Sequence, residues 1–274
     1  MVIIVQLPIP NSIVLGSKIM NCVHTLCALS LVLGFVGAAT ATEFAIRDGD
    51  TVVFMGDSIT AARTYGKIIE SYTLLRYPDR KVKFINVGQG GDTAAGGFKR
   101  LQRDVFDRGA TLLTVAFGIN DIGWGMKADD EHRKLYLDSI RGIVEECKKH
   151  NVRVFICSAA ATGENPETAE KGYLKKMCDE GMAISKSLGE GAIDIHGMMH
   201  ASQKKIWAHN AKLPKEKEKE KITLHAEDGI HLNEQGQMAM AFAILKGLGA
   251  PADVSSASLD AKAAKLIDAK GCMI

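Results

Sequence analysis

The chain has 274 residues, enough for one large α/β domain with a sizeable core. Hydrophobic residues make up 46% of it and charged residues 24%, a balance typical of globular enzymes. The formal net charge of +2 is close to neutral, so the composition argues against a nucleic-acid partner and an anionic membrane partner.

The first 41 residues differ from the rest. Residues 22–41 contain no Asp, Glu, Lys or Arg and end in Ala39-Thr40-Ala41, the small-x-small pattern of a signal-peptidase site. We therefore expect residues 1–41 to be a signal peptide and the protein to be exported, to the periplasm or the cell exterior. The alternative is an uncleaved membrane anchor, because the apolar stretch approaches the length of a membrane span. Translation from Met20 would remove Lys18, the one clear positive charge ahead of this stretch.

Four cysteines follow the export segment: Cys147, Cys157, Cys178 and Cys272. Their number permits two disulfides in an oxidising compartment, but the pairing cannot be deduced from sequence. Cys157 lies within an apolar stretch, so we expect it to be a packed thiol.

The stretch from Thr51 to Met55 predicts a strand that is buried on both faces. It stops at Gly56-Asp57-Ser58, which places Ser58 at the carboxyl end of the strand. Ligands bind at that edge of an open parallel sheet, so the Ser58 hydroxyl is a candidate nucleophile. The alternative is that Ser58 merely caps the next helix.

From Asp48 onward, predicted strands and helices alternate. The further strands cover residues 82–87, 112–117, 153–158 and 192–195. Apolar residues at helical spacing predict the intervening and final helices: Ile68, Tyr72 and Leu75; Phe98, Leu101 and Val105; Tyr136, Ile140, Val144 and Cys147; Leu174, Met177, Gly181, Ile184 and Leu188; Met238, Phe242 and Leu245. This pattern predicts one domain over residues 48–249, a three-layer α/β/α fold with a five-stranded parallel sheet in the flavodoxin-like order 2-1-3-4-5. For the tail, residues 250–274, we expect a terminal helix through Leu259, Leu266 and Ile267.

In that strand order the first strand lies between the second and the third. The loops after these strands therefore converge, and they carry Ser58, the glycine-rich segment Gly88–Thr93 and Asn120. Asn120 lies in a tight turn, Gly118 to Asp121, where its amide either donates to a ligand or satisfies its own backbone.

Near the carboxyl end, Asp228 and His231 are three residues apart. A serine is a poor nucleophile unless an imidazole takes its proton, and an acid must hold that imidazole in the right tautomer. The spacing allows the carboxylate to reach one ring nitrogen and leaves the other for Ser58. The alternative is a helix-start Asp beside a surface His.

Four blocks of sequence now resemble those of one family. Gly56-Asp57-Ser58-Ile59, Gly91-Asp92, Gly118 to Asp121 and Asp228 to His231 are similar, in type, order and spacing, to the four blocks of the SGNH (GDSL-type) esterase and lipase family. Two departures are visible. Ile59 replaces the Leu of the family's name, and Gly88-Gln89-Gly90 adds glycine that is expected to loosen the loop before Gly91.

The resemblance implies a role for each matching residue. Ser58 would be the nucleophile, with Asp228 and His231 completing the triad. The Ser58 and Gly91 N–H groups and the Asn120 amide would form the oxyanion hole. Asp57 and Asp121 would hold these catalytic groups in position without contacting the substrate.

Other candidate sites receive less support. The glycine segment lacks the dinucleotide fingerprint and the Gly-Lys-Ser/Thr of a phosphate loop, which argues against a flavin- or phosphate-binding flavodoxin-like protein. His196 and His200, close to Asp194, lack a convincing third metal ligand, so we expect them in a loop or on a helix surface. Lys215 to Lys221 alternates in charge and predicts a solvated segment. Trp124 is a candidate substrate wall or a packed aromatic.

We therefore expect a serine esterase that acts without metal or cofactor on carboxylic esters of small acyl groups, including acetyl groups on carbohydrate. A lipase or thioesterase would use the same mechanism. A carbohydrate-binding module that retains the fold without catalysis is the alternative from another class, and a membrane would be a partner only if the amino-terminal segment were uncleaved.

Overall fold

The computed structural model describes residues 43–169, 172–253, 255–263 and 265–270. The expected export segment, residues 1–41, and Cys272 lie outside these ranges, so what the sequence suggests for them stays a prediction. Across the described ranges, no helix combines the length and the apolar character needed to cross a membrane.

The central sheet has five parallel strands in the order β2-β1-β3-β4-β5, as predicted. The strands are β1 (Thr51–Gly56), β2 (Lys83–Asn86), β3 (Leu112–Ala116), β4 (Arg153–Cys157) and β5 (Gly191–Ile193). In β1, Thr51 lies opposite Lys83 of β2, and Val52 lies opposite Leu112 of β3. The loops after β1, β2 and β3 therefore leave the same edge of the sheet side by side.

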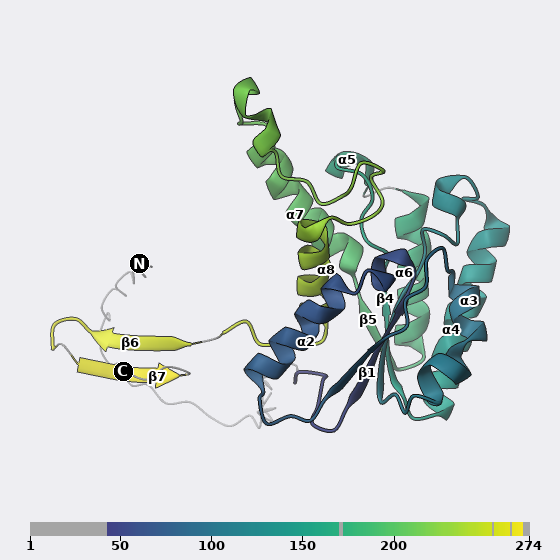
Figure 1. The fold of residues 1–274 in the computed structure, drawn as a ribbon, viewed down its shortest axis with the longest axis horizontal. Coiled ribbons are helices and arrows are strands. Elements are labelled where there is room, and N and C mark those ends of the chain that lie inside the picture. Colours follow the sequence, from purple (N-terminus) through teal and green to yellow (C-terminus); the bar gives the residue numbers. More distant parts are fainter. Residues whose placement is uncertain (1–42, 170–171, 254, 264, 271–274) are drawn as a thin grey trace, which may run out of the picture. The chain divides into compact units, whose positions relative to one another are not determined.

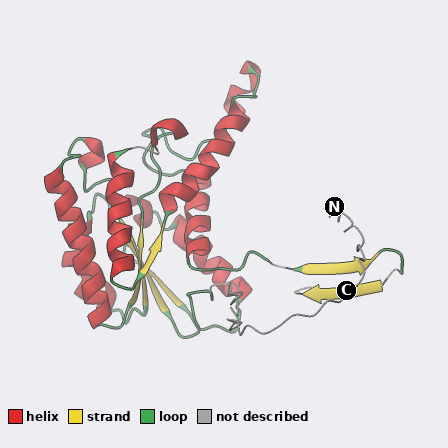
Figure 2. Cartoon of the chain, turned by 180° about the vertical axis from the view of Figure 1, so that it is seen from behind, coloured by secondary structure: helices red, strands yellow, loops and turns green. Residues whose placement is uncertain are grey.

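Helices cover both faces of this sheet, which gives the predicted three layers (Figures 1 and 2). One face is covered by α2 (Thr64–Arg76), α7 (Ile195–Asn210) and α8 (Glu234–Gly247), and the other by α3 (Ala94–Lys99), α4 (Asp130–Lys149) and α6 (Tyr173–Ser187). Two short helices, α1 (Ser58–Ala61) and α5 (Pro166–Ala169), follow β1 and β4. The helix predicted around Phe98, Leu101 and Val105 is divided into α3 and a π-helical turn, Gln102–Phe106.

Side chains of the strands alternate between the two layers of core. In β1, Val53 and Met55 pack with the α3, α4 and α6 layer, whereas Val52 and Phe54 pack with the α2, α7 and α8 layer. Alternate residues of a strand point to opposite faces, so a strand covered on both sides must be apolar at every position. This explains the unbroken apolar run that predicted β1.

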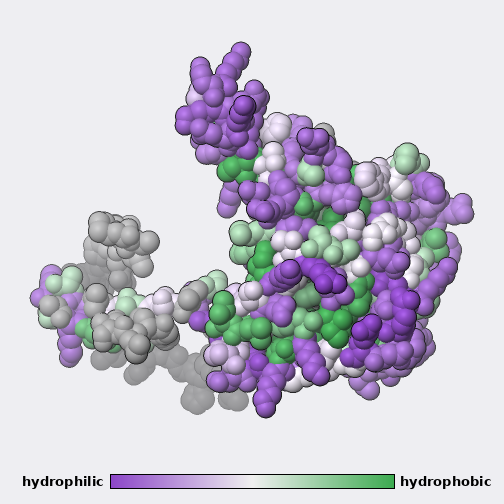
Figure 3. Space-filling view, in the orientation of Figure 1, coloured by the Kyte–Doolittle hydropathy of each residue, from purple (hydrophilic) through white to green (hydrophobic). Residues whose placement is uncertain are grey.

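The sequence predicted the buried face correctly for α4 but not for α8. Met238 and Phe242 of α8 are 63% and 60% exposed, while Met240 and Ile244 are buried. Figure 3 shows hydrophobic surface over the side of the molecule that α2 and α8 form. Residues 238–245 are all apolar, so spacing alone cannot choose which side of this helix faces the core.

The charged segment before the last helix is solvated, as predicted. Lys215–Glu220 forms a 3₁₀ turn that is exposed throughout, with ion pairs Lys217–Glu220 and Lys221–Glu218. It forms the hydrophilic projection at the top of Figure 3.

The predicted helix in the tail is wrong. The tail instead forms an antiparallel hairpin of β6 (Ser256–Asp260) and β7 (Lys265–Lys270). Asp260 Oδ1 accepts the N–H groups of Lys262 and Ala263 at 2.9 and 3.0 Å. This Asx-type turn reverses the chain where a helix would have continued it.

Three cysteines, Cys147, Cys157 and Cys178, are buried free thiols. Burial raises the pKa of each thiol to about 12. The expectation that Cys157 is a packed thiol is confirmed, and none of these three takes part in a disulfide.

Candidate active site

Ser58 is the first residue of α1, directly after the turn that follows β1. Asp57 is the N-cap of α1, and its Oδ1 accepts the Ile59 N–H at 2.9 Å. The alternative that Ser58 caps this helix is therefore wrong. A Cβ at Gly56 would fall 2.1 Å from Thr60 Oγ1 and 2.7 Å from the Ala116 carbonyl, so the chain can turn this tightly only with glycine.

A chain of hydrogen bonds connects Ser58, His231 and Asp228. Ser58 Oγ lies 2.9 Å from His231 Nε2, and His231 Nδ1 lies 2.6 Å from Asp228 Oδ2. The carboxylate can only accept from Nδ1–H, which leaves Nε2 to accept the Ser58 hydroxyl proton. The hydrogen bond from His231, followed by the Ile230 and His231 N–H groups, lowers the pKa of Asp228 to about 2. Asp228 is therefore ionised at neutral pH and holds the imidazole in this tautomer.

The loop that carries Asp228 and His231 is held in place by a β-bridge and by hydrogen bonds to the segment after β4. His225 pairs with Leu232 in a β-bridge, and the Gly163 N–H donates to the Gly229 carbonyl at 2.7 Å. Glu164 Oε1 accepts the N–H groups of Leu224 and His225 and also lies 3.0 Å from His225 Nδ1. Sequence analysis missed Glu164 and His225, because nothing in the spacing of two residues 61 positions apart indicates their contact.

The glycine-rich loop after β2 is tied down, contrary to the expectation that extra glycine loosens it. A Cβ at Gly88 would fall 2.3 Å from the Ala61 nitrogen, and the Gln89 N–H donates to the Gly56 carbonyl at 3.0 Å. Gly91 has a φ of +72°, where glycine is favoured. Its N–H donates to no other group in the described part of the chain, so it is available to a ligand.

Arg100 holds this loop from behind. Its guanidinium lies 2.7 Å from Asp92 Oδ2 and 2.8 Å from Asp104 Oδ2, and it donates to the Val87 carbonyl at 2.7 Å. The i,i+4 spacing of Arg100 and Asp104 was a visible signal in the sequence. The contact with Asp92 depends on the fold and gave no such signal.

Asn120 joins the third loop to the second, as the strand order predicted. Its Nδ2 donates to the Asp92 carbonyl at 3.0 Å, next to Gly91, and its Oδ1 accepts from Trp124 Nε1 at 2.9 Å. Trp124 is 47% exposed, and its ring meets the His231 ring edge-on, with centroids 5.7 Å apart. Trp124 therefore lies beside the Ser58–His231 pair and is not packed beneath the loop.

Asp57 and Asp121 are buried behind these loops. Burial is the main cause that raises the pKa of Asp57 to about 6 and that of Asp121 to about 7. Asp121 Oδ1 accepts the Ala94 N–H at 2.9 Å, so this carboxyl links the Asn120 turn to the start of α3.

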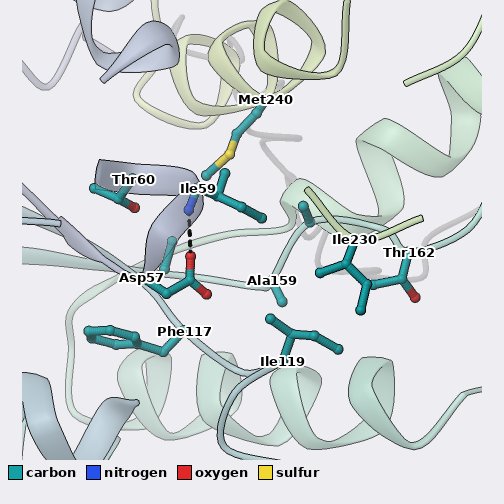
Figure 4. A pocket seen from close by; sticks show the side chains of 11 residues that line it. Asp57, Ile59, Thr60, Phe117, Ile119, Ala159, Thr162, Ile230 and Met240 are labelled. Carbon is teal, nitrogen blue, oxygen red and sulfur yellow. Dashed lines mark hydrogen bonds between the residues drawn. The ribbon is translucent and has the colours of Figure 1, made fainter. Parts of the chain in front are cut away.

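A cavity of about 10 Å³ lies among residues that flank Ser58 and His231 in the sequence (Figure 4). Asp57, Ile59 and Ile230 line it, together with Ile119 and Thr162. Its volume is about that of one water molecule. A larger hollow of about 310 Å³, lined in part by Trp124 and Tyr173, shares Ile119 and Thr162 with it.

The weak metal candidate is not supported. His196 and His200 lie on α7 and are 2% and 5% exposed, so the expectation of loop or surface positions is wrong. Asp194 Oδ1 instead accepts the Gly197 N–H at 2.9 Å and caps α7. In the ranges that the structure describes, no group of three or more His, Cys, Asp or Glu side chains is placed to hold a metal ion.

Solved structures with the same fold include several enzymes. Axe2, an acetylxylan esterase from Geobacillus stearothermophilus, is 19% identical, with a TM-score of 0.61 over 75% of this chain and 96% of its own. LAE5, an alpha/beta hydrolase enzyme from the metagenome of Lake Arreo, Spain, is also 19% identical, with a TM-score of 0.61 over 76% of this chain and 98% of its own. BT4096, a gut microbial diltiazem-metabolizing enzyme, is 25% identical, with a TM-score of 0.67 over 85% of this chain. The match covers 54% of BT4096, so this chain corresponds to about half of that protein.

The sequence comparisons give one match and one negative result. No curated protein sequence matches the chain. A family model described as GDSL-like lipase/acylhydrolase matches residues 52–244, which begin within β1, end within α8 and include all four sequence blocks. The chain therefore belongs to the GDSL-like lipase/acylhydrolase family and is a hydrolase that acts on esters.

Proposed function

We propose that this hydrolase is a serine esterase in which Ser58 forms an acyl-enzyme, with His231 as general base and Asp228 as its orienting acid. The observation that carries the proposal is the continuous hydrogen-bonded chain, 2.9 Å from Ser58 Oγ to His231 Nε2 and 2.6 Å from His231 Nδ1 to Asp228 Oδ2. This arrangement lets a neutral imidazole take the hydroxyl proton as the oxygen attacks an ester carbonyl.

The first half of the reaction follows from these positions. Ser58 Oγ bonds to the carbonyl carbon, its proton moves to His231 Nε2, and the carbonyl oxygen gains the negative charge. When the tetrahedral intermediate collapses, the bond to the alcohol oxygen breaks and His231 returns the proton to that oxygen. Ionised Asp228 stabilises the imidazolium that exists between the two proton transfers.

Three donors are assigned to the developing oxyanion. They are the Ser58 and Gly91 N–H groups and the Asn120 side-chain amide, on the loops after β1, β2 and β3. Such preorganised donors lower the barrier by roughly 3 kcal/mol each. The Asn120–Asp92 hydrogen bond supports the assignment because it holds the Asn120 amide beside Gly91. Asp57 and Asp121 are assigned to support these loops, through their bonds to the Ile59 and Ala94 N–H groups.

The second half repeats the first with water as the nucleophile. His231 takes a proton from water, the hydroxide attacks the acyl-enzyme, and the Ser58–acyl bond breaks with return of the proton to Ser58 Oγ. Each step as written uses side chains and main-chain N–H groups of this protein, the ester and water.

The proposed substrates are esters of small acyl groups, including acetyl groups on carbohydrate. The small acyl group is supported by the fold shared with an acetylxylan esterase, whereas the cavity of about 10 Å³ beside Asp57 is not lined by Ser58 or His231. The fold shared with the acetylxylan esterase Axe2 supports an acetylated carbohydrate as the alcohol part.

A fluorophosphonate probe and an ester panel test this proposal. The wild-type protein should be labelled on Ser58, and turnover of p-nitrophenyl esters should fall as the acyl chain lengthens from acetate. Acetylated sugars should be tested in the same assay. Ser58→Ala should abolish both labelling and turnover while its melting temperature stays close to that of the wild type.

Equal turnover by wild type and Ser58→Ala would reject Ser58 as the nucleophile. Faster turnover of long-chain esters than of acetate would reject the small acyl group and favour a lipase or thioesterase. Ligand binding without any labelling of Ser58 would favour the non-catalytic binding module.

A further inference from the structure

Trp124 has a backbone conformation that a bulky residue rarely adopts. Its φ and ψ are 59° and 29°, in the left-handed region, and it lies between two glycines that also have positive φ. Hydrogen bonds fix this turn, from the Trp124 N–H to the Ile119 carbonyl and from the Gly123 N–H to the Asn120 carbonyl. A glycine would adopt this conformation without strain, so we expect the Trp124 side chain to have a function that glycine could not supply.

The Trp124 side chain makes one specific hydrogen bond that a glycine at this position could not make. Indole Nε1 can only donate, and it donates to Asn120 Oδ1 at 2.9 Å. At the other end of the same amide, Asn120 Nδ2 donates to the Asp92 carbonyl, which can only accept. A flipped amide would set N–H against N–H and oxygen against oxygen, so the two contacts together allow one orientation of the Asn120 amide.

This orientation decides what Asn120 can offer a substrate. The amide nitrogen has two hydrogens, and the Asp92 carbonyl takes one of them. The second is left for another acceptor, as an oxyanion donor requires. The edge of the Trp124 ring also meets His231, so one side chain contacts residues from both sides of the site.

We propose that Trp124 is a positioning residue whose indole N–H fixes the Asn120 amide with its nitrogen directed to the substrate oxygen. The inference rests on the proposed function, because it assumes that Asn120 is an oxyanion donor. It differs from a substrate wall, which would depend on the ring and not on the N–H.

Trp124→Phe separates these two roles, because phenylalanine keeps an aromatic ring and removes the donor. We expect kcat for p-nitrophenyl acetate to fall about tenfold, less than the loss of a whole oxyanion donor, with KM changed by no more than about twofold. Unchanged kcat, with or without a raised KM, would overturn the inference.

A double-mutant cycle tests whether Trp124 acts through Asn120. Asn120→Ala should lower kcat by about two to three orders of magnitude. In the Asn120→Ala protein, Trp124→Phe should then cause little further loss. The same tenfold loss in both backgrounds would overturn the inference. If Ser58→Ala or Asn120→Ala retained full activity, the proposed function itself would fail.

Trp207 offers a matched control, because it is also 47% exposed but lies in α7. Trp207→Phe should leave kcat unchanged. Glycine at the two positions should give opposite results. Trp124→Gly should lower kcat without lowering the melting temperature, since glycine relieves the left-handed strain. Trp207→Gly should lower the melting temperature, because glycine weakens a helix. A Trp124→Gly protein that lost as much stability as Trp207→Gly would show that Trp124 serves the fold instead.

Discussion

At the scale of single residues, Asp121 shows how burial changes a carboxyl group. Its pKa is raised from 3.8 to about 7, chiefly by burial and further by the charges of Asp57 and Asp92. Because the folded-state pKa lies above the unfolded one, the unfolded chain loses this proton first as the pH rises. The contribution of Asp121 to the free energy of unfolding is therefore greatest below about pH 4 and declines between about pH 4 and pH 7.

Asp121→Asn should remove this decline, since an amide cannot ionise and its oxygen can still accept the Ala94 N–H. We expect the variant to exceed the wild type by on the order of 2 kcal/mol in unfolding free energy at pH 8, with the difference shrinking toward pH 4. Urea unfolding at pH 4, 6 and 8 measures this. Asp138→Asn, at an exposed carboxyl of α4, is the control. Equal pH dependence in wild type and Asp121→Asn would contradict the expectation.

Residue-level prediction from sequence succeeded where a short block was enough. Ser58, Asn120 and His231 each lie in a compact block, and the structure brings them to one edge of the sheet. The bond from Trp124 to Asn120 could not be predicted, because it depends on a left-handed turn that sequence patterns disfavour for tryptophan. The ion pair of Arg100 with Asp92 likewise depends on how α3 meets the glycine loop.

At the scale of elements, Glu164 is one of the residues that hold the loop from Leu224 to Asn233 in place. One carboxylate oxygen accepts three hydrogen bonds at 3.0 Å, two from the backbone and one from the His225 ring. His225 is buried, and its Nε2 lies 2.7 Å from the Ala161 carbonyl, so the ring ties the loop to the segment after β4. The same loop carries Asp228 and His231.

Glu164→Ala should therefore affect both stability and activity. Loss of three partners should lower the free energy of unfolding by about 1–3 kcal/mol, and a displaced His231 should lower kcat about tenfold or more. Glu167→Ala, at an exposed residue three positions away, should change neither. Circular dichroism melts measure the stability of both variants, and p-nitrophenyl acetate kinetics measure their kcat. Full activity in Glu164→Ala would mean that the loop holds its shape without this carboxylate.

Helices illustrate what a sequence pattern leaves open at this scale. The presence of α8 was predictable, but its rotation was not, because the run from Met238 to Leu245 is apolar on every side. Tertiary contacts choose the rotation: a Cβ at Gly236 would lie 2.0 Å from the Leu224 carbonyl, and Gln237 Oε1 accepts the Tyr65 N–H. Both contacts involve residues distant in sequence.

At the scale of the whole molecule, the strand order was predictable because right-handed crossovers leave few choices for alternating strands and helices. That order brings the loops after β1, β2 and β3 together, so most of the site was predictable as well. The tail was not, since its apolar residues are too few to distinguish a helix from a hairpin and the turn at Asp260 decided the outcome.

The core also indicates which part of the chain the fold requires. Among the described residues, those in the two core clusters and packed against them end at Ala250, and the hairpin β6–β7 contributes none. Before the hairpin, the Tyr72 hydroxyl donates to the Pro251 carbonyl and the Arg76 guanidinium to the Asp253 carbonyl.

A chain ending at Asp253 keeps both bonds. We expect it to retain the wild-type kcat and a melting temperature within about 2 °C of the wild type, since a surface change of this kind costs at most about 0.5 kcal/mol. A chain ending at Leu248 loses both bonds and the packing of Ala250, and should melt lower. Calorimetry and p-nitrophenyl acetate turnover on the two truncations separate the cases, and a chain ending at Asp253 that failed to fold or to turn over ester would show that the hairpin supports the domain.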